Sequence, residues 1–312
     1  MPDIEHLVLS AGGVNGFKLY GAAREAAKLG LWRVDKIKTI HGSSAGAMMG
    51  AMLALGYDWD WLDDYLIKRP WESLIAADER MLEAYSAGGV YGLEVAEGIL
   101  SPLLEAKGHS KDITLGQFCA ATGIDMYVIA TEVNTPLLTK VIISPKTHGD
   151  WPLVTAIGAS AAYPLLFRPV RKDGMCLVDG GLLSLYPMSE CLTNGWPPET
   201  VLGFRLAWPL EPEPVGENAS LIDVASALLR RTLQSVCSRD HRNQTTEGVV
   251  EVTSSAADLS FDSLREATGD AAQRLKLVNE GAAAARETFL RVRGVPPPTP
   301  PTETSEQTGA EI

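Results

Sequence analysis

Apolar positions fall into short runs and longer helical patterns that alternate along much of the chain. Short apolar runs predict buried strands, and apolar positions three and four residues apart predict helices. Strands are expected at residues 6–10, 37–40, 125–131, 141–143, 175–179, 200–206 and 248–252. Helices are expected at residues 17–29, 45–55, 58–68, 93–105, 151–161, 218–242 and 262–291. This alternation is typical of an α/β protein.

The segment from residue 37 to residue 55 carries the main candidate for chemistry. The expected strand leads into the turn Gly42-Ser43-Ser44-Ala45-Gly46, and an apolar helix rich in Ala and Met follows. A strand, a turn and a helix in this order are the context in which G-x-S-x-G forms a nucleophile elbow. Ser44 is then the candidate nucleophile at the first turn of a helix, where unpaired N–H groups favour negative charge. A purely structural turn before a core helix is the alternative, because the motif is short.

A second glycine-rich turn follows the first expected strand. The run Ala11-Gly12-Gly13-Val14-Asn15-Gly16 connects that strand to the helix expected at 17–29. Such a turn exposes successive backbone N–H groups and can bind an anion. Three interpretations are open: a dinucleotide-binding turn, an oxyanion hole for acyl transfer, or a structural turn. The dinucleotide interpretation is disfavoured because no acidic residue ends the second strand to hold a ribose.

Asp179 is the candidate acidic group. An apolar strand at 175–179 delivers it into the Gly180-Gly181 turn. Aspartate at a strand end is often only a turn former. Open α/β sheets also collect active-site groups at the carboxyl ends of their strands. Both the structural and the catalytic interpretation stay open on this pattern alone.

The helix expected at 58–68 combines acidic residues with large aromatic ones. One interpretation is an amphipathic helix that covers the core. The other is a lid or an interfacial patch that faces lipid.

Charge and cysteine content exclude several classes of function. The net charge of -12 and the pI of about 4.9 argue against a nucleic-acid partner and against electrostatic adhesion to anionic lipid. The cysteines form no C-x-x-C motif and no histidine pair has metal spacing, so reduced, buried thiols are expected and no metal or cofactor. No apolar run approaches the ~20 residues that span a bilayer, and the first residues do not resemble a signal peptide. A cytoplasmic location, peripheral at membranes, is expected.

Three motifs occur in one order along the chain: S-A-G-G-V-N-G from Ser10, G-S-S-A-G from Gly42 and D-G-G from Asp179. Three further stretches accompany them: A-T-E-V-N-T from Ala130, A-S-A-A-Y-P from Ala159 and L-V-D-G-G-L-L-S-L-Y-P from Leu177. Together they make the chain resemble the patatin-like phospholipase family over residues 4–210. Any one of the motifs alone would not be specific.

The resemblance implies a central, mostly parallel sheet sandwiched by helices in three α/β/α layers. We expect a single domain at 1–294, with the core motifs in 4–210 and a helical C-terminal extension at 215–292. Residues 295–312 are rich in Pro, Thr and Glu and are expected to form a disordered tail.

The resemblance also implies roles for individual residues. Ser44 would be the nucleophile of a Ser–Asp dyad, and Asp179 would take its proton and later help to activate water. The N–H groups of Gly12 and Gly13 would bind the oxyanion, with Gly16 shaping the turn. These roles agree with general chemistry, because serine needs an adjacent base and preorganised N–H donors stabilise a tetrahedral intermediate.

The histidines argue against a Ser–His–Asp triad. In the α/β-hydrolase order the histidine follows the acid, and only His241 follows Asp179. His241 lies in a polar stretch that looks like an exposed helix end. His41, three residues before Ser44, is expected to be a structural residue at the strand end.

Two positions depart from the family pattern. The glycine-rich loop of the family usually has three glycines in a row and a basic residue just before the last glycine. Ala11 and Asn15 stand at those positions here. The lost cation leaves the head-group preference open, and Lys18 is a nearby candidate to replace it.

The expected protein is a lipid acyl hydrolase that acts on phospholipid or lysophospholipid esters and contacts membrane surfaces transiently. The acyl chain is expected near the helix after Ser44 and near residues 59–71. A non-catalytic lipid- or partner-binding protein on the same fold is the first alternative, and a nucleotide-binding α/β protein is the second. The sequence does not separate phospholipase from lysophospholipase or general esterase, and it gives no oligomeric state.

Overall fold

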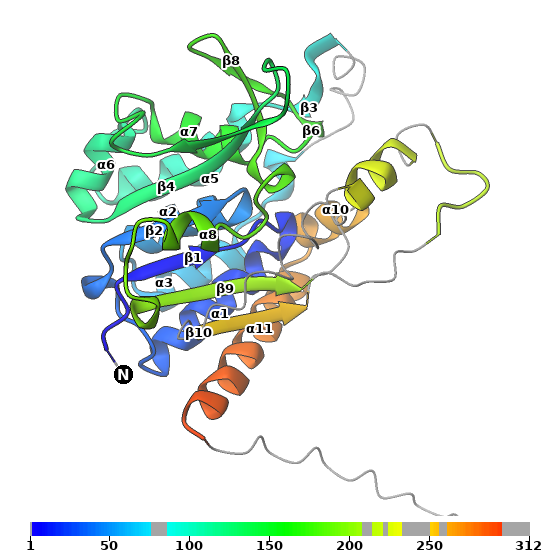
Figure 1. Ribbon diagram of the computed structural model, residues 1–312. Coiled ribbons are helices and arrows are strands. Elements are labelled where there is room, and N and C mark those ends of the chain that lie inside the picture. The colour runs from blue at the N-terminus through cyan, green and yellow to red at the C-terminus, as the bar shows by residue number, and fades with distance from the viewer. Residues whose placement is uncertain are drawn as a thin grey trace, which may run out of the picture.

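The computed structural model describes residues 2–75, 86–207, 214–220, 224–232, 250–255 and 261–294. A central sheet runs through the molecule, with helices on both faces (Figure 1). Its strands are β1 (His6–Leu9), β2 (Thr39–Ser43), β4 (Asp125–Glu132), β5 (Thr139–Ile143), β7 (Val170–Lys172), β8 (Met175–Asp179), β9 (Val201–Ala207) and β10 (Val250–Ser255). A small second sheet pairs β3 (Gly89–Tyr91) with β6 (Leu165–Phe167).

The helices differ widely in length. The α-helices are α1 (Gly16–Lys28), α2 (Ala45–Ala54), α3 (Trp59–Asp63), α5 (Leu93–Ala106), α6 (Leu115–Thr122), α7 (Leu153–Ser160), α8 (Met188–Leu192), α10 (Phe261–Gly269) and α11 (Ala271–Val292). Short 3-10 turns are η1 (Gly13–Asn15), η2 (Val34–Lys36), η4 (Glu72–Leu74), η5 (Gly180–Leu182) and η6 (Pro198–Thr200), and η3 (Asp64–Lys68) is a π-helical turn. Residues 224–232 are also helical.

The order of strands in the central sheet is β10-β9-β1-β2-β4-β8-β7, and β5 also pairs with β4. The strands from β10 to β4 are parallel, whereas β5, β7 and β8 are antiparallel to their neighbours. The expected fold class is therefore confirmed as a mostly parallel sheet flanked by helices.

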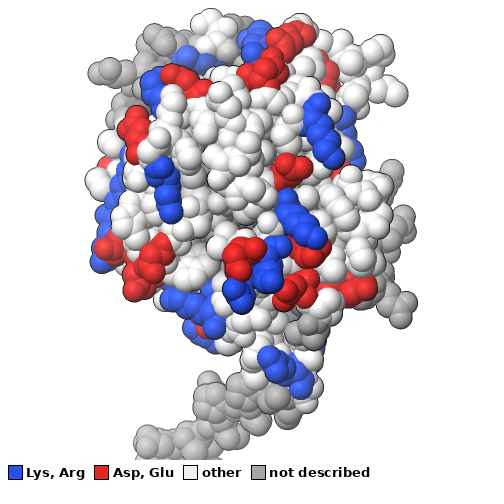
Figure 2. Space-filling model, turned by 90° about the vertical axis from the view of Figure 1, so that its left-hand side faces the viewer, with Lys and Arg blue, Asp and Glu red and all other residues white. Residues whose placement is uncertain are grey.

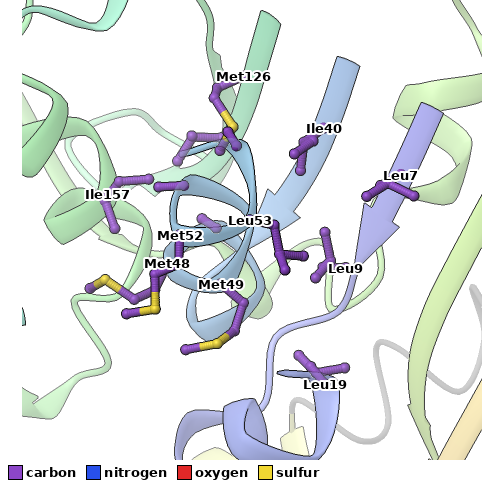
Figure 3. Close-up of a cluster of buried hydrophobic side chains, with 14 of the residues drawn as sticks. Leu7, Leu9, Leu19, Ile40, Met48, Met49, Met52, Leu53, Met126 and Ile157 are labelled. Carbon is purple, nitrogen blue, oxygen red and sulfur yellow. The ribbon is translucent and has the colours of Figure 1, made fainter. Parts of the chain in front are cut away.

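Side-chain alternation along the strands divides the core between the two faces of the sheet. Leu7 and Leu9 of β1 and Ile40 of β2 belong to the large core under α1 and α2, part of which Figure 3 shows. Val8, between the two leucines, packs with Met188 in a smaller core on the other face, where α8 lies. The helical cover is consequently thick on one face and thin on the other.

Helices α1 and α11 lie side by side (Figure 1), and two glycines allow their backbones to touch. A Cβ atom on Gly21 would lie 1.9 Å from the carbonyl oxygen of Val278, and one on Gly281 would lie 1.9 Å from that of Lys18. An ion pair between Lys18 and Glu280, with 2.6 Å between Nζ and Oε2, reinforces the contact. The amine of Lys18, considered above as a replacement cation for the glycine-rich loop, thus binds a carboxylate of α11.

Arg274 at the start of α11 is buried and donates to four backbone carbonyl oxygens. Two belong to Ile67 and Arg69, at 2.9 and 3.0 Å, and two to Ala267 and Thr268, at 2.9 and 2.8 Å. The guanidinium thereby satisfies carbonyl groups that the ends of η3 and α10 leave unpaired.

The segment expected as one helix at 58–68 is an α-helical turn followed by the π-helical turn η3. Leu62 and Leu66 are buried, and Asp63 accepts hydrogen bonds from Tyr20 (2.6 Å) and from Arg24 of α1 (2.5 Å). Trp61 stays 42% exposed. The segment therefore covers the core, as the amphipathic interpretation expects.

Two other expected boundaries are wrong, and one strand was missed. The strand expected at 37–40 is β2, which starts and ends later, because its last residues pair with β4 up to the Ser43–Ile129 position. The helix expected at 262–291 breaks between α10 and α11, where the Asp270 side chain accepts a hydrogen bond from the N–H of Ala272 and starts a new helix. The strand β3 was not among the expected strands.

Some predictions lie partly or wholly outside the described residues. Of the helix expected at 218–242, the structure describes residues 218–220 and 224–232, and His241 and Cys237 lie outside it, as does the tail at 295–312. The domain limits at 1–294 stay a prediction. The described cysteines Cys119, Cys176 and Cys191 are free and buried. None of the described helices has both the length and the hydrophobicity that a bilayer span requires.

The α1–α11 contact can be tested with Gly281→Ala. Overpacking of this kind costs about 1–3 kcal/mol, which exceeds the gain of up to about 1 kcal/mol from the better helix propensity of alanine. We expect a lower free energy of unfolding in urea. The matched control is Gly269→Ala in α10, where a Cβ atom would meet no atom of the described residues within 4 Å. Equal stability of the two variants would contradict the close backbone contact.

Candidate active site

Ser44 occupies a strained turn between β2 and α2. Its φ of 52° and ψ of -122° are costly for a residue with a side chain. The neighbouring glycines explain how the turn is packed. A Cβ atom on Gly42 would lie 2.6 Å from the backbone of Ala47, and one on Gly46 would lie 2.4 Å from the carbonyl oxygen of Leu9. Both glycines of G-S-S-A-G are thus required sterically.

Ser160 at the end of α7 supports this turn. Its Oγ accepts a hydrogen bond from the backbone N–H of Ser44 at 2.8 Å and donates to the carbonyl oxygen of Ile129 in β4. The side chain is fully buried. The A-S-A-A-Y-P stretch does not predict this role of Ser160, because one serine among small residues carries no signal of its partner.

Asp179 faces Ser44 across the end of β4. The register explains why: Ser43 pairs with Ile129 on one side of β4, and Asp179 pairs with Ala130 on the other. Ser44 Oγ donates a hydrogen bond of 2.6 Å to Oδ2 of Asp179. Strand β8 is antiparallel to β4, with Leu177 paired to Glu132 and Asp179 to Ala130. Asp179 therefore arrives next to Ser44 at the end of an antiparallel strand, and not at the end of a parallel one.

Further hydrogen bonds hold the aspartate in place. The N–H of Gly181 donates to Oδ1 of Asp179 at 2.7 Å, and the hydroxyl of Thr131 donates to its backbone carbonyl oxygen at 3.0 Å. The carboxylate therefore has a fixed orientation, with one oxygen bonded to backbone and the other to Ser44.

Burial raises the pKa of Asp179 to about 6. Desolvation disfavours the charged form, and the hydrogen bonds from Ser44 and Gly181 offset only part of this effect. The carboxylate is consequently a stronger base than an exposed aspartate, and it is still ionised at neutral pH.

The glycine-rich loop lies beside this pair. Gly13 has a positive φ of 51°, which favours glycine. A Cβ atom on Gly16 would lie 3.3 Å from that of Ala45, so the loop approaches the serine turn closely. Asn15 is fully buried, and both its side-chain Nδ2 and its backbone N–H donate to the carbonyl oxygen of Gly12, at 3.1 and 2.9 Å. Asn15 therefore ties down the loop at a position where the sequence departs from the pattern that the resemblance implies.

His41 lies on the other face of the sheet from the large core. Its ring stacks on Tyr127 at 4.4 Å between centroids and meets Trp196 edge-on. Burial lowers its pKa to about 3, so it is neutral at physiological pH. Its position is that of a packed structural residue.

An apolar cavity of about 370 Å³ opens next to Ser44. The five residues expected to form the dyad and the oxyanion hole all border it: Ser44, Asp179, Gly12, Gly13 and Gly16. Its apolar walls include Met48, Met49, Met52, Leu66, Trp71, Leu93, Ile99 and Phe167. No group of three or more His, Cys, Asp or Glu side chains suited to a metal is present in the described part of the chain.

The family model of the patatin-like phospholipases matches residues 7–192, which is more than half of the chain. The chain belongs to the patatin-like phospholipase family. The matched segment contains the serine turn, the glycine-rich loop and Asp179, whereas β9, β10, α10 and α11 lie outside it.

Two viral proteins are similar in sequence to this patatin-like chain. "Uncharacterized protein R571" of Acanthamoeba polyphaga mimivirus is 27% identical over 188 residues, which are 60% of this chain and 61% of that protein. "Probable lipid hydrolase 463L" of Invertebrate iridescent virus 6 is 26% identical over 185 residues, 58% of this chain and 61% of that protein. The chain thus matches about three fifths of the length of these curated relatives.

Among solved structures, VipD from Legionella pneumophila is similar in fold. The TM-score is 0.52 at 16% sequence identity, and the match covers 92% of this chain and 67% of VipD. At this identity the likeness shows the shared fold.

The raised pKa of Asp179 has a consequence for stability. Its folded pKa of about 6 lies above the ordinary value of 3.8, so the folded state binds the proton more tightly than the unfolded state. Wild-type stability should therefore fall as pH rises from about 4 to about 6. Asn does not titrate, so the free energy of unfolding of Asp179→Asn should rise relative to that of wild type by up to about 3 kcal/mol across this range. Above this range the difference between the two proteins should stay constant. Urea unfolding at several pH values measures the difference, and a gain that does not change with pH would contradict the raised pKa.

Proposed function

We propose that the protein is a lipid acyl hydrolase that cleaves carboxylic esters of phospholipids or lysophospholipids through a Ser44–Asp179 dyad. The observation that carries this proposal is the 2.6 Å hydrogen bond from Ser44 Oγ to a buried carboxylate at the wall of an apolar cavity. Family membership and the similarity to a viral protein named as a probable lipid hydrolase support it.

In the first step Ser44 Oγ attacks the carbonyl carbon of the ester. The hydroxyl proton passes to Oδ2 of Asp179, to which it is already hydrogen-bonded. The raised pKa of the carboxylate favours this transfer, because a base with a pKa nearer to the operating pH accepts a proton more readily.

The oxyanion formed in this step needs donors close to Ser44. Gly12 and Gly13 border the cavity, and no described residue accepts a hydrogen bond from their backbone N–H groups. They would bind the oxyanion, while Gly16 allows the loop to approach α2. Removing one such donor in other hydrolases costs about 10²–10³ in rate.

Collapse of the tetrahedral intermediate expels the alcohol of the substrate, which takes the proton from Asp179 and leaves an acyl-Ser44 ester. Water then attacks the acyl carbonyl carbon and gives its proton to Asp179. When the second intermediate collapses, Ser44 Oγ leaves and regains that proton, and the fatty acid is released. This balance needs no metal and no other cofactor.

The substrate class follows from the cavity wall. Methionine and other apolar side chains suit an acyl chain, and apolar contact contributes about 25 cal/mol for each Å² buried. Met48, Met49 and Met52 offer flexible side chains that adapt to different chain shapes. We place the acyl chain along this helix, with its ester at Ser44.

Transient contact with a membrane surface is part of the same proposal. On the face in Figure 2, positive and negative side chains are interspersed and separated by uncharged surface, which offers no basic patch for anionic lipid. Leu137 and Leu138, in the connection between β4 and β5, are 81% and 53% exposed. Contact through apolar side chains of this kind fits the net charge of -12.

The dyad is tested with Ser44→Ala and Asp179→Asn. Because the two residues act as a unit, each change should lower turnover of phospholipid esters by about a thousandfold or more. Intact mass after reaction with an alkyl fluorophosphonate should show one adduct on wild type, none on Ser44→Ala and much slower labelling of Asp179→Asn.

Ser43→Ala is the matched control. Ser43 Oγ is buried and has no hydrogen-bond partner among the described residues, so its removal should leave labelling and turnover close to wild type. Near-normal turnover of Ser44→Ala would exclude the dyad. Lipid binding by folded wild type with neither turnover nor an adduct would instead favour the non-catalytic alternative.

The pH dependence of labelling gives an independent prediction. Ionised Asp179 accepts the serine proton, so the rate constant for fluorophosphonate labelling should be level above the pKa of about 6 and fall about tenfold per pH unit below it. The rate constant is measured at each pH by quenching the labelling reaction at several times and determining the labelled fraction by mass spectrometry. A profile that is flat down to about pH 4 would show that Asp179 is not the base.

A further inference from the structure

A second cavity, of about 260 Å³, lies at the far end of α2 from Ser44. Its walls come from the ends of α1 and α2 and from α3, with η2 at one side. The apolar residues that border it are Ala27, Trp32, Val34, Met52, Leu53, Tyr57, Trp59 and Leu62. The functions considered so far give it no role.

Among the described residues, Met52 alone borders both cavities. Ala45, Met48, Met49 and Met52 follow the spacing of one helix face and border the cavity at Ser44. Leu53 and Gly56, which follow Met52 in the sequence, border the second cavity. Met52 lies about 12 Å along the helix from Ser44, at 1.5 Å per residue. Figure 3 shows the three methionines on α2.

The second cavity suits an apolar occupant. Two of its aromatic residues direct their polar atoms to backbone: Trp32 Nε1 donates to the carbonyl oxygen of Ala23 at 2.9 Å, and the hydroxyl of Tyr57 donates to the carbonyl oxygen of Leu103. Ring surfaces therefore remain for contact. The charged residues on its border, Arg33 and Asp35, bind each other in an exposed ion pair.

We propose that the second cavity is a subsite for the distal part of a long acyl chain, and that Met52 is the partition between the two cavities. This inference rests on the proposed function for the ester end of the chain. Met52 is 1% exposed and borders both cavities, so a chain that continues from the first into the second would have to displace its side chain. Its unbranched side chain has three rotatable bonds and can turn aside at small cost.

The subsite sets the chain-length preference. Short chains end within the cavity at Ser44 and never reach Met52, whereas longer chains displace it and gain contact with the rings beyond. Each further methylene buried should raise affinity about fourfold, and the displacement of Met52 subtracts from that gain.

The test is equilibrium binding of saturated fatty acids from octanoate to stearate, measured by calorimetry on the full chain. Met52→Ala removes the partition and should raise the ratio of stearate to octanoate affinity at least fourfold over wild type. The matched control is Met49→Ala, which deletes the same atoms from the same helix but borders the first cavity alone. Circular dichroism and thermal unfolding establish that both variants are folded.

Val34→Trp approaches the second cavity from its rim, where Val34 is 39% exposed and tolerates a larger side chain. It should lower the stearate-to-octanoate ratio at least fourfold, because the indole fills the space beyond Met52. Equal ratios for Met52→Ala and Met49→Ala, or an unchanged ratio for Val34→Trp, would overturn the subsite.

Binding separates this inference from the proposed reaction. If fluorophosphonate labels Ser44 and the affinity ratios do not change, the hydrolase proposal stands and the subsite fails. If no adduct forms and the ratios change as expected, the subsite stands in a lipid-binding protein and the hydrolase proposal fails.

Discussion

The hydrogen bond between Ser44 Oγ and Asp179 joins residues 135 positions apart in the sequence. Much of the fold serves to keep these two residues side by side. The register of β4 with β2 on one side and with β8 on the other fixes their relative position. Ser160 and Thr131 then bind the backbone at each end. Because all of these contacts converge on the end of β4, a shift of that strand by one residue would separate the pair.

This arrangement is costly for the folded state. Ser44 adopts a backbone conformation that side chains rarely take, and Asp179 keeps a carboxylate away from water. The large apolar core under α1 and α2 offsets both costs. Strain and burial concentrated at two facing groups are typical of a site selected for reactivity over stability, and they support the chemistry we propose.

The sequence predicted the fold class and the local context of Ser44, because strand and helix patterns and the glycine spacing are local signals. It did not predict that β8 is antiparallel, since a short apolar strand carries no sign of its direction. The break at Asp270 was missed because the helical pattern continues on both sides. Ser160 and the second cavity could not be predicted at all, because each arises from contacts between segments far apart in the sequence.

The contact between α1 and α11 limits how this chain can be divided. Helix α1 follows directly on the glycine-rich loop, yet its outer face rests on α11, beyond the segment that the family model matches. Arg274 of α11 also binds the backbone next to Leu66, a wall residue of the cavity at Ser44. The shared family segment is therefore not a module that could be transplanted alone. A chimera with a relative would have to carry α11 together with α1, or redesign the surface where their backbones meet.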